Sequence, residues 1–95
     1  MVQEETISLI RAERSRQDQL HGEHSHSPTE WLPILIEEAG EVSKEVCDGC
    51  HKYRGVYDFA QLRQELVQVA AVAVAWIEDM SRAECEVPDY EDSTV

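Results

Sequence analysis

The sequence predicts an all-α fold in which three main helices form half of an oligomeric helical bundle. Two observations carry this prediction. Apolar residues recur every three or four positions through most of the chain, and no stretch alternates apolar and polar residues as a half-buried strand does. The third helix is apolar on opposite faces, which a small monomer cannot bury by itself. We therefore expect a homodimer or homotetramer, with the helical domain at residues 1–82 and a flexible acidic tail at residues 83–95.

The first helix is expected from about Glu4 to Leu20. Its apolar stripe is thin and lies among many charges; it consists of Ile7, Ile10 and Leu20. This helix should therefore pack on the others rather than nucleate folding. Gly22 is the expected stop, because glycine commonly ends helices.

The second helix is expected to begin at Ser27-Pro-Thr-Glu30, a capping box with proline at the first helical position. It should end near Asp48-Gly49. Pro33 lies in the second turn, so either the helix kinks there or regular helix begins nearer to Leu32. Gly40 inside the helix leaves room for a close approach by a neighbouring segment. The apolar stripe consists of Trp31, Leu35, Ala39, Val42 and Val46.

The third helix follows a loop at residues 50–57 and is expected from about Phe59 to Met80. Asp58 is the predicted N-cap, with Gln61 three residues later. The predicted core stripe consists of Leu62, Leu66, Val69, Ala73, Trp76 and Met80. A second apolar set, on the opposite face, consists of Val67, Ala71 and Val74. This second face is expected to meet another copy of the protein.

Composition narrows the functional classes. The chain has 8 basic and 20 acidic residues, a formal net charge of −12, which argues against binding to a nucleic-acid polymer. The N-terminus has no basic start before an apolar run, and the longest apolar stretch, residues 66–77, is short for a membrane span. Three cysteines, an odd number, fit a reducing compartment. We expect a soluble, acidic, cytoplasmic domain without a membrane partner.

Carboxylates on the second and third helices are the strongest chemical feature. Glu38 and Glu41 are three residues apart and share a helix face, and Glu65 and Gln68 repeat that spacing at the head of an apolar stretch. Carboxylates against an apolar face cost free energy unless a charge compensates them. If the two helices pack antiparallel, four oxygen-bearing side chains converge, and Mg²⁺ prefers oxygen ligands. From spacing alone, a solvated face of ordinary surface glutamates is the alternative.

The run Glu37-Glu38-Ala-Gly-Glu41, followed after a loop by Glu65-x-x-Gln68, resembles the signature of the MazG-type nucleoside triphosphate pyrophosphohydrolases. These belong to the all-α NTP pyrophosphatase superfamily, whose pattern is Glu-Glu-x-x-Glu and then Glu-x-x-Asp. The resemblance covers roughly residues 10–80. It implies a helical dimer or tetramer that converts (d)NTP to (d)NMP and pyrophosphate with Mg²⁺, in nucleotide-pool housekeeping, with Mn²⁺ as a substitute metal.

The resemblance also implies roles for individual residues. By position, the metal ligands are Glu38, Glu41, Glu65 and Gln68. Glu37 corresponds to a carboxylate that orients water, and Glu37 or Glu38 takes the proton of the attacking water. The chain departs from the family pattern at Gln68, where the pattern has Asp. A glutamine carbonyl can still coordinate Mg²⁺, but the site loses one negative charge.

Substrate-binding candidates come from several segments. Lys44, which flanks Glu41, and the loop residues Lys52 and Arg54 could offset the charge of a triphosphate. For each of them, an ordinary solvated surface charge is at least as good an interpretation. Gln17, near the end of the first helix, could reach a ligand that lies across the bundle. Trp31 could stack on a base, but its place on the apolar stripe favours core packing.

Two alternatives from other functional classes stay open. One is a non-catalytic nucleotide-binding or interaction protein on the same scaffold, with a metal site weakened by Gln68. The other is a zinc-stabilised helical adaptor, whose candidate ligands are Cys47, Cys50, His51 and Cys85. The linker histidines His21, His24 and His26 are expected to be solvent-exposed and without a role.

Overall fold

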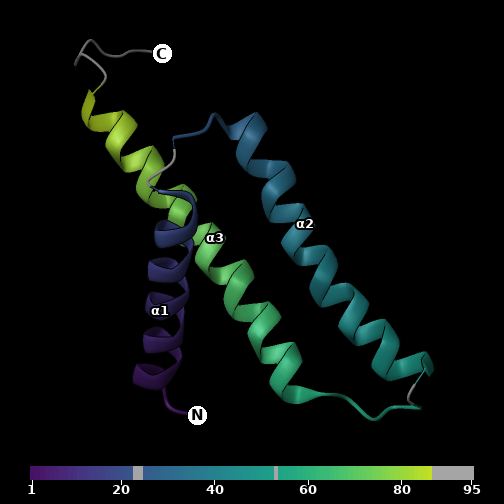
Figure 1. Cartoon of the computed structure of the whole chain (residues 1–95). Helices are drawn as coiled ribbons and strands as arrows, with labels where there is room; N and C mark the ends of the chain where they lie inside the picture. The colour runs from purple at the N-terminus through teal and green to yellow at the C-terminus, as the bar shows by residue number, and fades with distance from the viewer. Residues whose placement is uncertain (23–24, 53, 87–95) are drawn as a thin grey trace.

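The computed structural model describes residues 1–22, 25–52 and 54–86, and Figure 1 shows them as helices joined by short connections. The elements are α1 (Gln3–His21), α2 (Pro28–Cys47), a π-helical turn η1 (Asp48–Lys52) and α3 (Phe59–Glu86). The described ranges contain no strand, so the all-α prediction is confirmed. No helix in them is long and apolar enough to cross a membrane.

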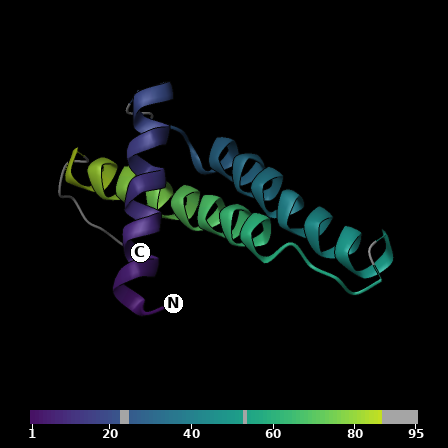
Figure 2. The same ribbon diagram turned by 60° about the horizontal axis from the view of Figure 1, so that its bottom comes forward.

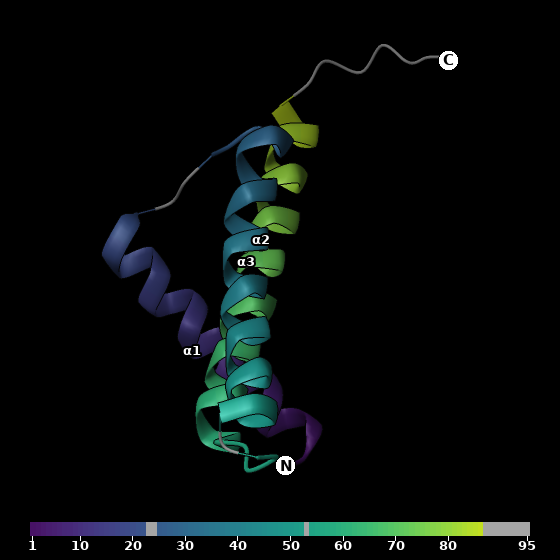
Figure 3. The same cartoon turned by 90° about the vertical axis from the view of Figure 1, so that its right-hand side faces the viewer.

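The third helix is the centre of the fold. α2 and α3 lie side by side and antiparallel, and α1 crosses α3 on another side (Figure 1, Figure 2). Both α1 and α2 pack on α3, whereas α1 and α2 do not pack on each other within the described part of the chain. Figure 3, viewed from the side, shows α1 leaning away from the α2–α3 pair. The molecule is therefore a helical hairpin with one crossing helix.

Local signals set the helix boundaries. The backbone N–H of Ser27 donates to Glu30 Oε1 at 2.8 Å, which is half of the predicted capping box. Asp58 Oδ1 accepts from the backbone N–H of Gln61 at 3.0 Å, as expected of an N-cap. Gly22 follows the last residue of α1 with a φ of 74°, a conformation that favours glycine. These three boundary predictions are confirmed.

Two expectations for α2 are corrected. The helix begins at Pro28 and runs through Pro33, so the later start is wrong, and the missing N–H of Pro33 costs one hydrogen bond within the helix. A Cβ added at Gly40 would meet no atom within 4 Å, so none of the described segments approaches it closely. The closely covered glycine is Gly49, where the ring of Tyr57 leaves no room for a side chain.

The third helix is longer than expected. It continues past Met80 to Glu86, so the boundary expected between residues 82 and 83 lies inside a helix. The remainder of the expected tail, residues 87–95, lies outside the described residues.

The core is thin. Trp31, Ala71 and Val72 are the buried apolar residues of the described chain, and no large side chain is fully buried. A domain of this size has little interior, and one crossing helix beside a hairpin encloses even less. Much apolar surface therefore stays on the outside of this chain.

The buried stripe of α3 is rotated away from the predicted one. Glu65, Val72 and Asp79 follow one another at seven-residue spacing and are all buried. Leu66 and Met80, which were expected in the core, are 51% and 47% exposed. The other four predicted residues, Leu62, Val69, Ala73 and Trp76, are half-buried, so the prediction is correct in part. It missed the most buried stripe because two of its positions carry carboxylates, which an apolar pattern does not detect.

α1 packs against the opposite apolar face of α3. Ala71 is fully buried, and Val67 and Val74 line hollows that they share with α1 side chains such as Ile10. The contact of this face with another copy of the protein stays a prediction. The apolar side chains that remain exposed lie elsewhere on α2 and α3.

Candidate functional site

Two carboxylates meet where α2 packs on α3. Glu38 is half-buried, whereas its neighbour Ala39, which was expected in the apolar stripe, is exposed. Glu65 approaches from α3 and is only 8% exposed. Burial raises the pKa of Glu38, and the negative charge of Glu65 raises it further. The packed interface thus contains two partly dehydrated acids that repel each other.

The negative charge of Glu65 is the less compensated of the two. Within the described chain it has neither a hydrogen-bond donor nor a cation as partner. Burying a carboxylate without a partner costs free energy, so an acid is not favoured at a position whose role is only structural. The position is therefore a candidate for binding a cation.

The other predicted ligands lie around this pair. Glu37 and Glu41 are exposed on α2, and their charges also raise the pKa of Glu38. Gln68 is half-buried, one turn beyond Glu65 on α3. The predicted carboxylates thus form one electrostatic cluster.

A fifth acid comes from α1 and was missed by the sequence analysis. The side chain of Glu13 is 11% exposed, and its charge also contributes to the raised pKa of Glu38. Arg16 donates from Nε and Nη2 to Glu13 at 2.9 and 2.6 Å, and Gln17 Nε2 donates to it at 3.1 Å. The bonds from Arg16 lower the pKa of Glu13. The only sequence signal was the i, i+3, i+4 spacing of the three residues.

A pocket of about 380 Å³ opens beside Glu38 and is lined by residues of all three helices and the linker. Its α1 and linker side carries Arg14, Arg16, Gln17, His21 and His26. Its α2 side carries Trp31, Ile34, Glu37 and Glu38, and α3 supplies Val72 and Ala75. The size is that of a small-ligand site, and opposite charges face the same space. Gln17 is the one predicted substrate contact of α1 that the structure places here.

One end of this pocket is fixed by a buried acid, Asp79, which the sequence analysis also missed. Asp79 Oδ2 accepts from the backbone N–H of His26 at 2.8 Å and from Trp31 Nε1 at 2.7 Å. These two bonds, with that of His26 first, lower the pKa of Asp79. Trp31 stacks on Trp76 with ring centroids 6.4 Å apart and is 6% exposed. The prediction that Trp31 packs in the core is confirmed, although its ring also borders the pocket.

Arg14 connects α1 to α3. Its Nη2 donates to Glu78 on α3 at 3.2 Å, and its Nη1 donates to Asp18 at 3.1 Å. The pair with Glu78 joins α1 to α3, whereas the pair with Asp18 lies within α1. Nothing in the spacing of the sequence indicated the long-range pair, since the two residues belong to different helices.

The other predicted cations lie away from the pocket. Lys44 is exposed and stands 3.8 Å from Asp48. Arg54 is exposed in the connection before α3, with a φ of 55°. Lys52 belongs to η1, and its side chain lies outside the described part. The cations that line the pocket are instead Arg14 and Arg16 of α1.

No three His, Cys, Asp or Glu side chains of the described residues stand close enough together to form a finished metal site. The donor chemistry of the acidic cluster nevertheless fits a hard divalent cation, because every donor is an oxygen and Glu65 has no partner in the described part of the chain. Cys47 and Cys50 are free and exposed, and the side chain of Cys85 lies outside the described side chains.

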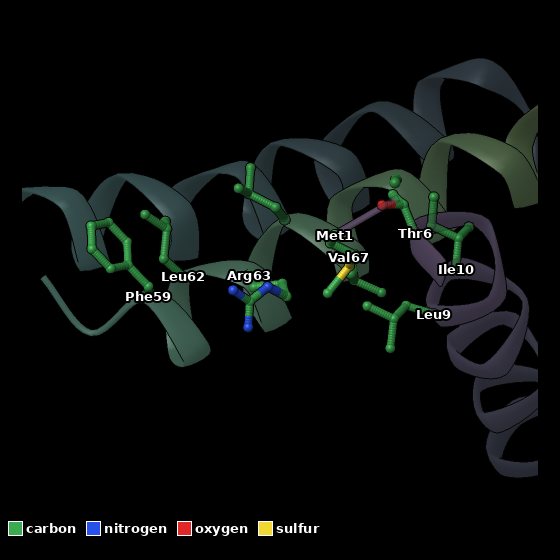
Figure 4. Close-up of a pocket in the computed structure, with 10 residues that line it drawn as sticks. Met1, Thr6, Leu9, Ile10, Phe59, Leu62, Arg63 and Val67 are labelled. Atoms are coloured by element: carbon green, nitrogen blue, oxygen red, sulfur yellow. The ribbon is translucent and has the colours of Figure 1, made fainter. Parts of the chain in front are cut away.

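A second hollow, of about 430 Å³, lies between the N-terminal half of α1 and the start of α3. Figure 4 shows its mainly apolar lining, including Leu9, Phe59, Leu62 and Val67, with Arg63 at its side. Its described lining contains no carboxylate, and its polar side chains are those of Thr6 and Arg63. Of the acids predicted from the sequence, Glu37 and Glu38 line the other pocket.

No protein-family model, no curated protein and no solved structure matches this chain. Any functional assignment therefore depends on the residues and their geometry.

Proposed function

We propose that this protein is a Mg²⁺-dependent nucleotide pyrophosphohydrolase that converts (d)NTP to (d)NMP and pyrophosphate in nucleotide-pool housekeeping. The observation that carries the proposal is the half-buried Glu38, which lines a pocket with two arginines on its other side. Beside it lies Glu65, a buried acid that has no partner among the described residues. Such a site offers negative charge for a metal and positive charge for the phosphates of its substrate.

The metal ligands in this proposal are Glu38, Glu41, Glu65 and Gln68. A bound Mg²⁺, or Mn²⁺ in its place, supplies neutralisation of phosphate charge and a lower pKa for a coordinated water. Charge explains why the ligands suit this role, because the cation removes the repulsion that raises the pKa of Glu38.

The remaining chemistry belongs to side chains of the protein. Glu37 or Glu38 accepts the proton of the water that attacks phosphorus, as a carboxylate beside the coordinated water can do. Arg14 and Arg16 face the same pocket and offset the charge of the triphosphate. Gln17 also lines the pocket, and its amide, which bonds to Arg14 and Glu13 in the structure, would exchange one of these bonds for the ligand.

The proposal includes a homo-oligomer, completed through α2 and α3. Ile36 on α2 and Ile77 on α3 are 59% and 58% exposed, and Leu32, Leu66 and Met80 are exposed on the same two helices. So many exposed large apolar side chains on a thin core are typical of a buried interface. α1 covers one face of α3, so the second copy is placed on faces that α1 leaves open.

A non-catalytic nucleotide-binding protein is the second candidate. Gln68 favours it, because the half-buried amide supplies no negative charge where the signature has a carboxylate. The pocket would then bind a nucleotide through the same arginines without hydrolysing it.

A turnover assay tests the proposal. Purified protein is incubated with each dNTP, each NTP and dUTP, with Mg²⁺ or Mn²⁺, and pyrophosphate is measured separately from single phosphate. We expect monophosphate plus pyrophosphate, and a loss of about 100-fold or more in Glu38→Ala, since a metal ligand acts in the transition state. Glu84→Ala, an exposed position on α3, is the matched control and should retain activity.

Two outcomes separate the candidates. If the folded, metal-loaded protein binds nucleotides in a calorimetric titration but turns none of them over, the binding-only function replaces the enzyme. If it neither binds nor hydrolyses any nucleotide, both candidates fail.

A further inference from the structure

We infer that two neighbouring acids of α3, Glu78 and Asp79, are positioning residues that set the width of the pocket beside Glu38. Glu78 holds the α1 wall of this pocket, and Asp79 holds the wall that the linker and the start of α2 form. The ligand that needs both walls is a whole nucleotide, which is longer than its triphosphate alone. The inference rests on the proposed function, because it concerns the same pocket.

The pocket depends on α3 because its other two walls do not support each other. It is lined by all three helices, but α1 and α2 do not pack on each other within the described part of the chain. α1 also leans away from the α2–α3 pair, as Figure 3 shows. The distance between the two walls therefore depends on how each of them is attached to α3.

The α1 wall is attached through Arg14. This residue lines the pocket, and its Nη2 donates to Glu78 Oε1 at 3.2 Å. The side chain of Arg14 is 17% exposed, whereas that of Glu78 is 53% exposed. The ion pair thus fixes a largely buried arginine of the pocket wall against α3.

The second wall is attached through Asp79. Its Oδ2 accepts from the backbone N–H of His26 at 2.8 Å and from Trp31 Nε1 at 2.7 Å, and both of these residues line the pocket. Asp79 is 3% exposed. The rings of His26 and Trp31 meet edge to face, with their centroids 4.9 Å apart. One buried carboxylate therefore holds the linker and the first turn of α2 together.

The two acids are consecutive in the sequence but serve different walls. Successive residues of an α-helix point about 100° apart, so neighbours on α3 can reach α1 and the start of α2 respectively. Both attachment points belong to one continuous helix, which runs from Phe59 to Glu86. A ligand that contacts both walls at once benefits from this fixed spacing, because a site that is already in place orders fewer groups on binding.

Titration calorimetry with ligands of two lengths tests the inference on the full chain. The α,β-imido analogues of the four common dNTPs are long enough to contact both walls, whereas inorganic triphosphate needs only the arginines. With Mg²⁺ in the buffer, and at a temperature where circular dichroism shows the variant to be folded, we expect Asp79→Asn to weaken binding of the analogues by roughly 10-fold. Binding of inorganic triphosphate should change by less than about 2-fold. Loss of both affinities by the same factor, or of neither, overturns the inference.

Glu78→Gln gives an independent measurement. It removes a negative charge beside Arg14, which favours both kinds of ligand alike, so the ratio of the two affinities isolates the effect of position. We expect the affinity for the analogues to fall by roughly 3-fold relative to that for inorganic triphosphate, a smaller change than at Asp79 because this ion pair is exposed. An unchanged ratio overturns the inference.

Two further variants complete the test. Glu84→Gln removes the same charge from an exposed position of α3, and as the matched control it should change either affinity by less than about 2-fold. If Asp79→Asn does not fold, Trp31→Phe removes the indole N–H and keeps an aromatic ring. The same selective loss of the analogues is expected in it, and an unchanged ratio overturns the inference.

The failure of this inference can be told from the failure of the proposed function. If the wild-type protein neither binds nor hydrolyses any dNTP, the proposed function fails and the inference fails with it. If the wild type hydrolyses dNTPs, and Asp79→Asn binds the analogues as tightly as wild type, the inference about the two acids fails alone.

Discussion

At the scale of the single residue, Glu38 shows a conflict between stability and chemistry. Its pKa is raised by burial and by neighbouring acids, so the folded state binds its proton more tightly than the unfolded state, whose pKa is about 4.3. Above that value the stability of the fold therefore falls with pH until the group is fully ionised. At neutral pH the ionised Glu38 destabilises the fold.

We accordingly expect Glu38→Gln to raise the melting temperature at pH 7 while it abolishes turnover. A gain of about 1 kcal/mol corresponds to roughly 4–8 °C in a domain of this size. The gain should shrink near pH 4, where the wild-type carboxyl is protonated. Thermal unfolding followed by circular dichroism at both pH values provides the measurement, with Glu84→Gln as control. A lower melting temperature in Glu38→Gln at pH 7 would show that a further interaction of the protein stabilises the ionised carboxylate of Glu38.

Gln68 is the second residue whose replacement is informative. Gln68→Asp adds a charged ligand beside Glu65, and we expect metal affinity and kcat to rise, by roughly 10-fold or more. The same change should lower stability without metal, because it adds a like charge to the cluster. Turnover and Mn²⁺ titration are measured on both proteins. A rise from a baseline near zero favours the binding-only function for the natural chain, and a fall in both quantities contradicts the ligand role of position 68.

At the scale of the element, Asp79 joins α3 to the start of α2. Its carboxylate accepts the N–H of His26 and the indole N–H of Trp31, and these bonds lower its pKa. A depressed pKa contributes stability that is present above the unfolded value of about 3.9 and is lost as the pH falls through the folded value. The junction between α2 and α3 should therefore loosen only in acid, below about pH 4.

Asp79→Asn removes the charge and keeps the shape. We expect a melting temperature about 5–10 °C lower at pH 7, because hydrogen bonds to an ionised acceptor are stronger than neutral ones. Tryptophan fluorescence should shift as well, since Trp31 and Trp76 are the stacked pair next to the junction. The acid-induced change of fluorescence seen in wild type should disappear in the variant. An unaltered acid transition in Asp79→Asn would assign it to another group.

The elements also show what the sequence could predict and what it could not. The ends of α1 and α2 and the cap at Asp58 were predictable because capping depends on neighbours in the chain. The inward face of α3 was not, because it carries the acids Glu65 and Asp79, and Asp79 is accommodated there by partners distant in the sequence, Trp31 and His26. The positions of Glu13 and of the α1 arginines depend on how α1 crosses α3, which no local pattern encodes.

At the scale of the whole molecule, a thin core coexists with a strongly charged site. The described residues bury few large side chains and include a buried acid, Glu65, that has no partner among them, so little stability is available to support the site. α1 uses one face of α3, while Ile36 and Ile77 remain on the surface. A second copy that covers them would supply the missing burial and would make the geometry of the α2–α3 site depend on assembly.

This leads to a prediction about assembly. We expect the wild-type protein to be a dimer or tetramer at micromolar concentration, and Ile77→Glu to weaken the association by roughly 100-fold or more, because a buried charge without a partner is costly. Val56→Glu is the matched control, since Val56 is 70% exposed in the connection before α3, away from the proposed interface. Sedimentation velocity over a range of concentrations measures the association, and turnover of the dissociated variant shows whether the site needs its partner. A wild-type protein that stays monomeric at high concentration would mean that the exposed apolar side chains of α2 and α3 serve a different partner.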